Sequence, residues 1–282
     1  MNIRPLCDAQ ETKTRELGNM RIIVCMKQVP DPSASSSGTK VDSEAKRVIL
    51  PQGTPPVLSP FDENALEAAL KIKDAQGAKI TVISAGRNLA KAVLRRSLAV
   101  GADDLILLED NAFDRLDSYA TAHLLATAIR QTGDYDLILC GRQAADTDAG
   151  QVGSGIAEIL KIPGITAASK VELSNGKVTV ERVVSDGYEV IESPMPALVT
   201  VSSEVGELRY PGVKQIMAAQ KTPITVRNGQ ELGVDVSRLK RLTLVRLSSP
   251  PGRNTECQFI GGETPEEAGV NLALKVRGAQ LL

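Results

Sequence analysis

The chain has 282 residues, of which 42% are hydrophobic and 24% are charged, which is ordinary composition for a globular protein. A net charge of −1 at pH 7 excludes a general electrostatic attraction to nucleic acid or to anionic membranes. Aromatic residues make up only 2%, too few for the stacking platforms that bind single-stranded nucleic acid.

Residues 1–19 mix positive and negative charges and lack the apolar centre of a signal peptide, so we expect a disordered N-terminal extension. No apolar run reaches the roughly 18 residues of a transmembrane helix, and no membrane insertion is expected. The cysteines, Cys7, Cys25, Cys140 and Cys257, show no CxxC spacing that would indicate a zinc or redox motif. A reducing, cytoplasmic setting fits this usage.

The first half of the chain alternates short apolar runs with helical patterns. Ser59 and Pro60 mark a helix start, with the serine able to cap it, and Gly77 marks its end. Strands each followed by a helix predict a mostly parallel sheet covered on both faces, a doubly wound α/β fold. The expected strands are 21–27, 79–83, 104–108 and 136–140, and the expected helices begin at 59 and cover 89–100, 118–131 and about 150–160.

The second half predicts an added antiparallel hairpin region. Segments 170–173 and 177–184 alternate apolar and polar residues around Ser174-Asn175-Gly176, a strong hairpin signal. A strand at 188–191, a buried strand at 197–201 and a helix at about 211–222 follow. From residue 228 the chain is polar, with one strand-like run at 242–247. We expect a nucleotide-binding α/β domain at 20–227 and a C-terminal arm at 228–282.

Ligands of open α/β sheets bind at the carboxyl ends of the strands, near a switch in strand order. The loop GRQAADTDAGQVG at 141–153 follows such a strand and leads into a helix whose free amides suit a phosphate. Asp146 and Asp148 complicate this hypothesis, because carboxylates repel a phosphate. The spacing of Asp148 and Gln151 is also that of a capping box, so a structural turn and a helix cap remain an alternative.

The sequence lacks the usual motifs of a hydrolase. There is no GxxxxGK[ST] loop and no GxGxxG after the first strand, and the one histidine, His123, lies within an expected helix. We therefore expect no catalytic triad, no metal site and no acid–base catalytic residue, with any chemistry supplied by a bound cofactor.

Several segments together resemble the beta (small) subunit of electron transfer flavoproteins. They are IIVCMKQVPD at 22–31, PFDENALEAAL at 60–70, the loop at 141–153, Arg209-Tyr210 followed by IMA at 216–218, LGVD at 232–235, and Pro250-Pro251. The similarity runs from Met20 to about Arg253. Segments 27–31 and 64–67 look more like the anaerobic, nitrogen-fixation and bifurcating branch, although Ala145-Asp-Thr-Asp148 departs from its usual pattern.

The resemblance implies an adenine nucleotide alpha hydrolase-like fold, a heterodimer with an alpha subunit, and an electron carrier that serves partners such as acyl-CoA dehydrogenases. It implies FAD, or alternatively AMP, in this subunit. The cofactor-binding residues that it implies are Cys25, Lys27, Ser59, Pro60, Phe61, Asp62, Ala85, Gln143, Ala144, Asp146, Thr147, Asp148, Ala149, Gly150, Gln151, Val152, Gly153 and Ser154. The partner-recognition residues that it implies are Arg209, Tyr210, Val213, Ile216 and Met217.

Two other classes of protein are less well supported by the residues. A nucleotide-sensing module similar to universal stress proteins has no Gly-Ser or Gly-Thr phosphate signature after Gly153 to support it. An ATP-pyrophosphatase needs a Ser-Gly-Gly-like loop after the first strand, where this chain has Lys-Gln-Val-Pro-Asp.

Overall fold

The computed structural model describes residues 20–34, 38–249 and 257–281, so the expected extension at 1–19 and Pro250-Pro251 lie outside the described residues. Contacts divide the chain into two units. The first contains the chain before residue 40 together with Leu50–Val245, and the second contains Lys40–Ile49 and Arg246–Leu282.

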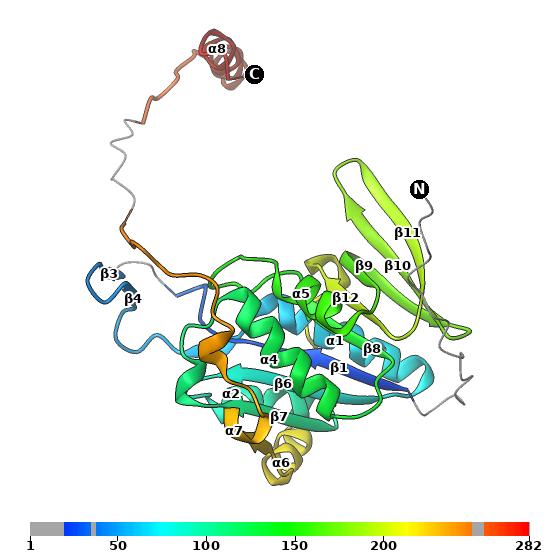
Figure 1. Cartoon of the computed structure of the whole chain (residues 1–282). Helices are drawn as coiled ribbons and strands as arrows, with labels where there is room; N and C mark the ends of the chain where they lie inside the picture. The colour runs from blue at the N-terminus through cyan, green and yellow to red at the C-terminus, as the bar shows by residue number, and fades with distance from the viewer. Residues whose placement is uncertain (1–19, 35–37, 250–256, 282) are drawn as a thin grey trace, which may run out of the picture. The chain divides into compact units, whose positions relative to one another are not determined.

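The first unit is built on a nine-stranded sheet of order β11-β10-β9-β12-β8-β1-β6-β7-β13 (Figure 1). Neighbours from β9 to β13 in this order are parallel, whereas β10 is antiparallel to both of its neighbours, β9 and β11. The chain builds outward from β1 in both directions, which puts a topological switch point between β1 and β8. The strands are β1 (Arg21–Cys25), β6 (Lys79–Gly86), β7 (Asp104–Glu109), β8 (Leu137–Gly141), β9 (Gly164–Ser174), β10 (Lys177–Val184), β11 (Gly187–Pro194), β12 (Ala197–Val201) and β13 (Thr225–Arg227).

Helices cover both faces of this sheet, because successive residues of a strand point to opposite sides. Ile22 and Val24 pack in one core with α1 and α3, and Ile23 and Cys25 pack in a second core with α4 and α5 (Figure 1). The doubly wound, mostly parallel fold expected from the sequence is therefore confirmed. The helices are α1 (Pro60–Gln76), α2 (Lys91–Leu94), α3 (Arg96–Val100), α4 (Ser118–Gln131), α5 (Val152–Leu160), α6 (Val213–Lys221) and α7 (Gly229–Leu232).

Side-chain capping marks the start of α4 but not the start of α1. The Asp117 carboxylate accepts a hydrogen bond from the Ala120 N–H at 2.8 Å and so caps α4. Ser59 stands at the N-cap position of α1 before Pro60, but its side chain makes no capping hydrogen bond, contrary to the expectation. Glycine ends α1 as predicted, at Gly77, with a positive φ of 77°.

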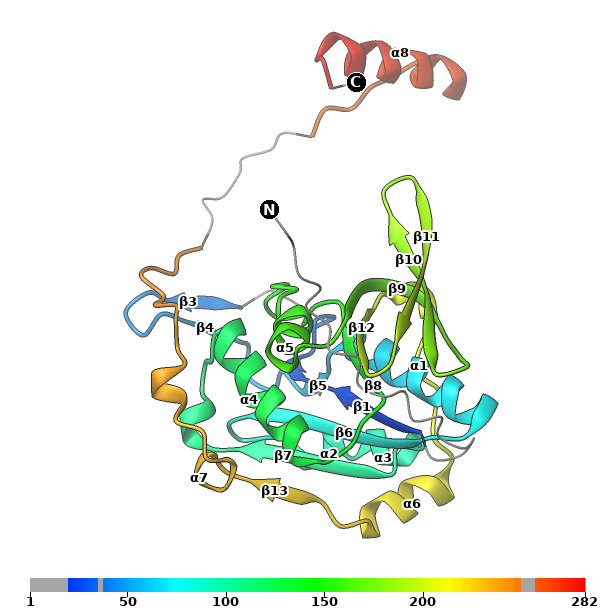
Figure 2. The ribbon, with the colours of Figure 1, turned by 45° about the vertical axis from the view of Figure 1, so that its right-hand side comes forward.

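The antiparallel region is larger than the sequence pattern predicts. β9 extends back to Gly164, because its first residues pair with β12 of the parallel sheet before the strand continues into the hairpin. β10 and β11 pair over their full lengths, and Figure 2 shows this hairpin projecting beyond the helices. Elsewhere β2 (Gln28–Pro30) pairs with β5 (Pro56–Leu58) as a small separate sheet.

Two details of the predicted elements were wrong. The helix expected at 89–100 is broken at Arg95 into α2 and α3, where the Ser97 hydroxyl bonds the Leu94 carbonyl at 2.7 Å and competes with the helical ladder. The helix expected at about 150–160 is confirmed as α5, which begins at Val152. No strand forms at 242–247, since the N–H groups of Arg241 and Leu242 donate to the Asp117 carboxylate.

The sequence pattern gives little indication of the short elements beyond residue 222. β13 adds an edge strand beside β7, and α7 and a 3-10 turn at Val236–Arg238 bring Leu232 and Val236 into the second core. Residues 228–245, expected in the arm, thus group with the first unit.

In the second unit, β3 (Lys40–Asp42) and β4 (Arg47–Ile49) form an antiparallel hairpin. α8 (Pro265–Gly278) is capped by Thr264, whose hydroxyl accepts from the Glu267 N–H at 3.2 Å. None of the residues of α8 is buried.

We predict that Leu137→Ala lowers the free energy of unfolding by about 2–5 kcal/mol, because a fully buried leucine at the centre of the sheet leaves a cavity when it is truncated. Val190→Ala is the control. That side chain is 70% exposed in β11, and its loss should change stability by less than about 0.5 kcal/mol. Urea unfolding of both variants makes the comparison, and equal losses would contradict the burial argument.

Candidate functional site

A cavity of about 590 Å³ opens at the carboxyl ends of β1, β6 and β8, at the switch point of the sheet. This volume lies in the usual range for small-molecule and cofactor sites. Most of the cofactor residues implied by the sequence line it. They are Cys25, Lys27, Asp62, Ala85, Gln143, Ala144, Asp146, Thr147, Ala149, Gly150, Gln151, Val152 and Gly153.

The other implied residues lie behind the cavity wall or beside it. Ser59 is completely buried, and its hydroxyl has no hydrogen-bond partner in the structure. The Phe61 ring lies under the Arg142 guanidinium at 5.0 Å, a cation–π contact. Pro60, Asp148 and Ser154 also do not line the cavity.

The Asp62 carboxylate joins the ends of the two central strands. It accepts a hydrogen bond from the Lys27 N–H at 2.8 Å, just after β1, and another from the Gly141 N–H at 3.1 Å, at the end of β8. Gly141 must be glycine here, because a Cβ would lie 2.6 Å from Oδ1 of Asp62. Asp62 therefore fixes the floor of the cavity.

Burial strongly affects the charge of this carboxyl group. Desolvation raises the pKa of Asp62 from 3.8 to about 7, against the opposing effects of its two N–H donors and of the Lys27 charge. The protonated and ionised forms are therefore both accessible near neutral pH.

The two acids of the loop at 141–153 are already engaged. The Lys27 ammonium contacts both carboxylate oxygens of Asp146, at 2.7 and 2.6 Å. The Gln143 amide donates to Asp148 at 2.8 Å. Asp148 does not cap α5 as the alternative reading proposed, since the N-cap is Gln151 and no side chain caps the helix. These pairings reduce the repulsion that the two carboxylates would exert on a phosphate.

Three helices direct their N-termini toward the cavity. Asp62 of α1, Ser118 of α4, and Val152 and Gly153 of α5 all line it. A helix N-terminus carries partial positive charge, and the first amides of α5 have no side-chain cap. The arrangement can therefore bind an anion such as a nucleotide phosphate.

Sequence reasoning missed one wall of the cavity. That wall consists of the chain after β7, residues 113–118, together with Leu242. The carboxyl-end rule applies to β7 as well as to β1, β6 and β8, and it could have indicated residues 113–118. Leu242 reaches the cavity because its N–H binds Asp117, a long-range contact without a local signal.

The implied partner-recognition residues divide into two groups. The Arg209 guanidinium is bound by Glu67 at 2.8 Å and by Asp74 at 2.7 Å, so it fastens its loop to α1. Tyr210, Val213 and Met217 are exposed by 85, 74 and 58%, and Ile216 is also exposed. α6 and Tyr210, which precedes it, thus present an apolar surface, formed by Tyr210, Val213, Ile216 and Met217 and called here the apolar surface of α6.

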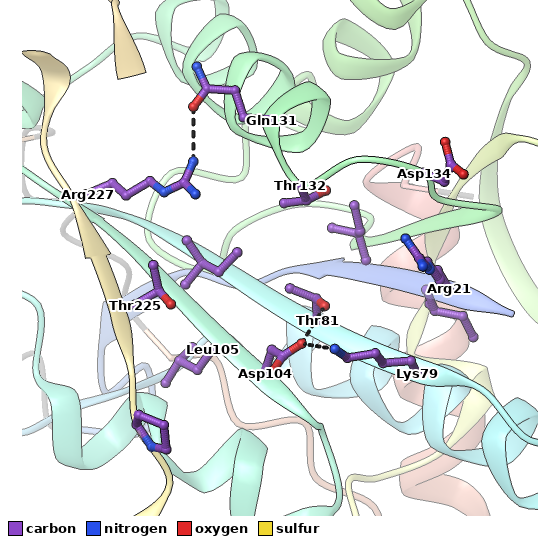
Figure 3. A pocket seen from close by; sticks show the side chains of 14 residues that line it. Arg21, Lys79, Thr81, Asp104, Leu105, Gln131, Thr132, Asp134, Thr225 and Arg227 are labelled. Carbon is purple, nitrogen blue, oxygen red and sulfur yellow. Dashed lines mark hydrogen bonds and ion pairs between the residues drawn. The ribbon is translucent and has the colours of Figure 1, made fainter. Parts of the chain in front are cut away.

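A second hollow, of about 390 Å³, lies at the amino ends of the strands (Figure 3). Two pairs of its side chains contact each other. Lys79 contacts Asp104 at 2.8 Å, and Arg227 donates to the Gln131 side chain at 3.0 Å. The C-terminus of α4 also borders it, at Gln131 and Thr132.

We predict that Asp62→Asn changes how stability depends on pH. The pKa of Asp62 is higher in the folded chain than its ordinary value, so the wild type loses stability as pH rises from about 4 to about 7. The variant lacks this titration. The free energy of unfolding of wild type relative to the variant should fall by up to about 4 kcal/mol over that range, for a shift of about three pKa units. Urea unfolding at several pH values measures it, and a constant difference would contradict the burial of the charge.

Among the described residues, no group of three or more His, Cys, Asp and Glu side chains is placed to bind a metal ion. No helix in the described part of the chain is both long enough and apolar enough to cross a membrane.

Comparisons with known proteins agree with the geometry. The Electron transfer flavoprotein domain family matches residues 46–232. The beta subunit of the electron transfer flavoprotein of Thermoanaerobacterium thermosaccharolyticum is 43% identical over 93% of this chain and all of its own length. Subunit CarD of the caffeyl-CoA reductase-Etf complex of Acetobacterium woodii is 39% identical with the same coverage. Protein FixA of Azorhizobium caulinodans is 35% identical over 78% of this chain and 79% of its own. The chain therefore belongs to the electron transfer flavoprotein family, as a beta-type subunit whose role is electron transfer.

Proposed function

We propose that this subunit binds the adenylate part of FAD in the cavity at the carboxyl ends of β1, β6 and β8. The observation that carries the proposal is the uncapped N-terminus of α5 at this cavity, with the Lys27 ammonium beside it. Both features favour a phosphate. AMP offers the same adenylate and is the alternative ligand.

The residues have distinct roles in this proposal. The amides of Val152 and Gly153 bind phosphate oxygens, the Gln151 side chain adds a donor, and Lys27 contributes positive charge beside Asp146. Asp62 positions Lys27 and Gly141 through their backbone amides. The flavin supplies the electron-transfer chemistry when bound, and the protein supplies orientation and electrostatics.

FAD is preferred to AMP because of sequence features near the site. Segments 27–31 and 64–67 are similar to those of the nitrogen-fixation and bifurcating branch, and the relatives include a FixA protein and a subunit of a CoA-thioester reductase complex. Electron bifurcation by the complex stays a prediction.

We propose two surfaces for partner proteins. The apolar surface of α6 docks a flavoenzyme of the acyl-CoA dehydrogenase or reductase class, since exposed apolar clusters mark interaction sites. α8 packs on the alpha subunit of a heterodimer. A 14-residue helix is marginal alone in water, and α8 exposes Val270, Leu272 and Leu274 without burying any residue.

The test of cofactor content is purification of the chain with its alpha subunit, followed by release and counting of FAD and AMP. Two FAD per heterodimer are expected. One FAD with one AMP per heterodimer would mean that this subunit binds AMP in place of FAD. The absence of an adenine nucleotide from this subunit would contradict the proposed function.

We predict that Lys27→Met weakens AMP binding to the nucleotide-free complex about tenfold, because a charge-assisted contact to phosphate is lost. Lys79→Met is the matched control, since Lys79 also pairs with an aspartate but lies at the opposite end of the sheet. Calorimetric titration compares the two variants. Equal affinity of the two variants for AMP would mean that the phosphate does not bind beside Lys27.

We predict that the double variant Val213→Asp, Met217→Asp slows electron exchange with the partner dehydrogenase at least about tenfold, while flavin content stays unchanged. Charges on a docking surface must be desolvated on binding, which weakens the complex. Val190→Asp on exposed β11 is the control and should leave the rate unchanged. Stopped-flow absorbance of the flavin measures the rates, and an unaffected double variant would exclude α6 as the docking site.

A further inference from the structure

Two cysteine thiols lie side by side in the floor of the cavity. Cys25 ends β1 and Cys140 lies near the end of β8, and the two residues are register partners on these parallel neighbouring strands. Both belong to the core that contains α4 and α5, so their side chains point to the same face of the sheet. Both are free thiols and both line the cavity.

The backbone spacing suits a disulfide. Neighbouring strands lie about 4.8 Å apart, and disulfides join residues whose Cα atoms are about 4.4–6.8 Å apart. The Cα atoms of the two residues therefore lie within the range that a disulfide spans. The bond also needs the two Cβ atoms to approach to about 3.5–4.5 Å, a small closure at the ends of the two strands. Nothing in the spacing of the cysteines along the chain indicates this pair, because only the parallel register of β1 and β8 brings them together.

The surroundings make the pair slow to react. The thiols are 6 and 5% exposed, and their access is through the cavity. The neighbouring Cys25 thiol, burial and the Asp62 carboxylate all raise the pKa of Cys140 well above its usual value. Because the thiolate is the reactive form, oxidation is slow at neutral pH and needs an open cavity.

We propose that Cys25 and Cys140 form a redox-modification site, in which a hydroperoxide converts the two thiols to a disulfide across the floor of the cavity and a bound adenylate protects them. The protective effect rests on the proposed function. Disulfide formation rests only on the geometry of the two strands.

The reaction balances with hydrogen peroxide as the oxidant. One thiolate attacks a peroxide oxygen, the O–O bond breaks, and a sulfenic acid and water form after proton transfer. The second thiol then attacks the sulfenic sulfur, a S–S bond forms, and a second water leaves. Two thiols and one hydrogen peroxide thus give one disulfide and two waters, with two electrons passing from sulfur to peroxide.

The test uses the full chain in its complex with the alpha subunit, with Cys7→Ser and Cys257→Ser in place and the nucleotide removed. After treatment with hydrogen peroxide, trypsin should release peptide 22–27 joined to peptide 131–142, and dithiothreitol should separate them. Cys25→Ser in the same background is the control and should give no joined peptide. An added peptide with an exposed thiol serves as the measure of complete oxidation. Two outcomes would overturn the proposal: separate peptides that carry sulfinic or sulfonic acid, or Cys25 and Cys140 still unmodified once the added peptide is fully oxidised.

A second arm adds saturating AMP, whose binding is first measured by calorimetry. We expect AMP to slow formation of the joined peptide at least tenfold. If AMP binds and the rate is unchanged, the protective effect is wrong and AMP lies elsewhere. If AMP does not bind but the joined peptide forms, the proposed nucleotide site fails while the disulfide stands.

Discussion

The site depends on one buried carboxylate, that of Asp62. At the switch point β1 and β8 are neighbours in the sheet, but the chain leaves them in different directions, so amides at the ends of these strands need other acceptors. Asp62 supplies acceptors for two of them, on Lys27 and Gly141. Unpaired buried amides would cost on the order of 1–3 kcal/mol each. The backbone of Phe61 and Asp62 fits closely against Gly141, where a Cβ would have no space. The first turn of α1, the end of β1 and the end of β8 therefore form one rigid corner.

The sequence predicted most reliably the elements whose signal is local. α4 was expected at the residues where it forms, because its apolar spacing is helical and Asp117 precedes it. β10 and β12 also match their alternating and apolar runs. The position of the cavity followed from the general rule for parallel sheets, without any knowledge of strand order. The sequence did not show strand register, which places Cys25 beside Cys140. It also did not show the long-range hydrogen bond between Leu242 and Asp117.

Local signatures failed at three positions, each for a different reason. Asp148 and Gln151 have capping-box spacing, yet Asp148 accepts from Gln143 and leaves α5 uncapped. Ser59 occupies a cap position but is buried with its hydroxyl unpaired. Arg209 fits a recognition motif, but Glu67, itself nearly buried, takes its guanidinium. In the first case the lost cap leaves the free amides that a phosphate site requires.

The direction of the helices explains why only one end of the sheet suits an anion. Every strand–helix unit of a parallel sheet places the helix N-terminus at the carboxyl end of the strand, so partial positive charges gather there. α1, α4 and α5 do so around the larger cavity. The hollow at the amino ends receives the C-terminus of α4 instead, and Asp104 and Asp134 line it (Figure 3). Both ends carry lysine–aspartate pairs of similar length, Lys27 with Asp146 and Lys79 with Asp104. The pairs alone therefore cannot select a phosphate, and the backbone dipoles make the difference between the two ends.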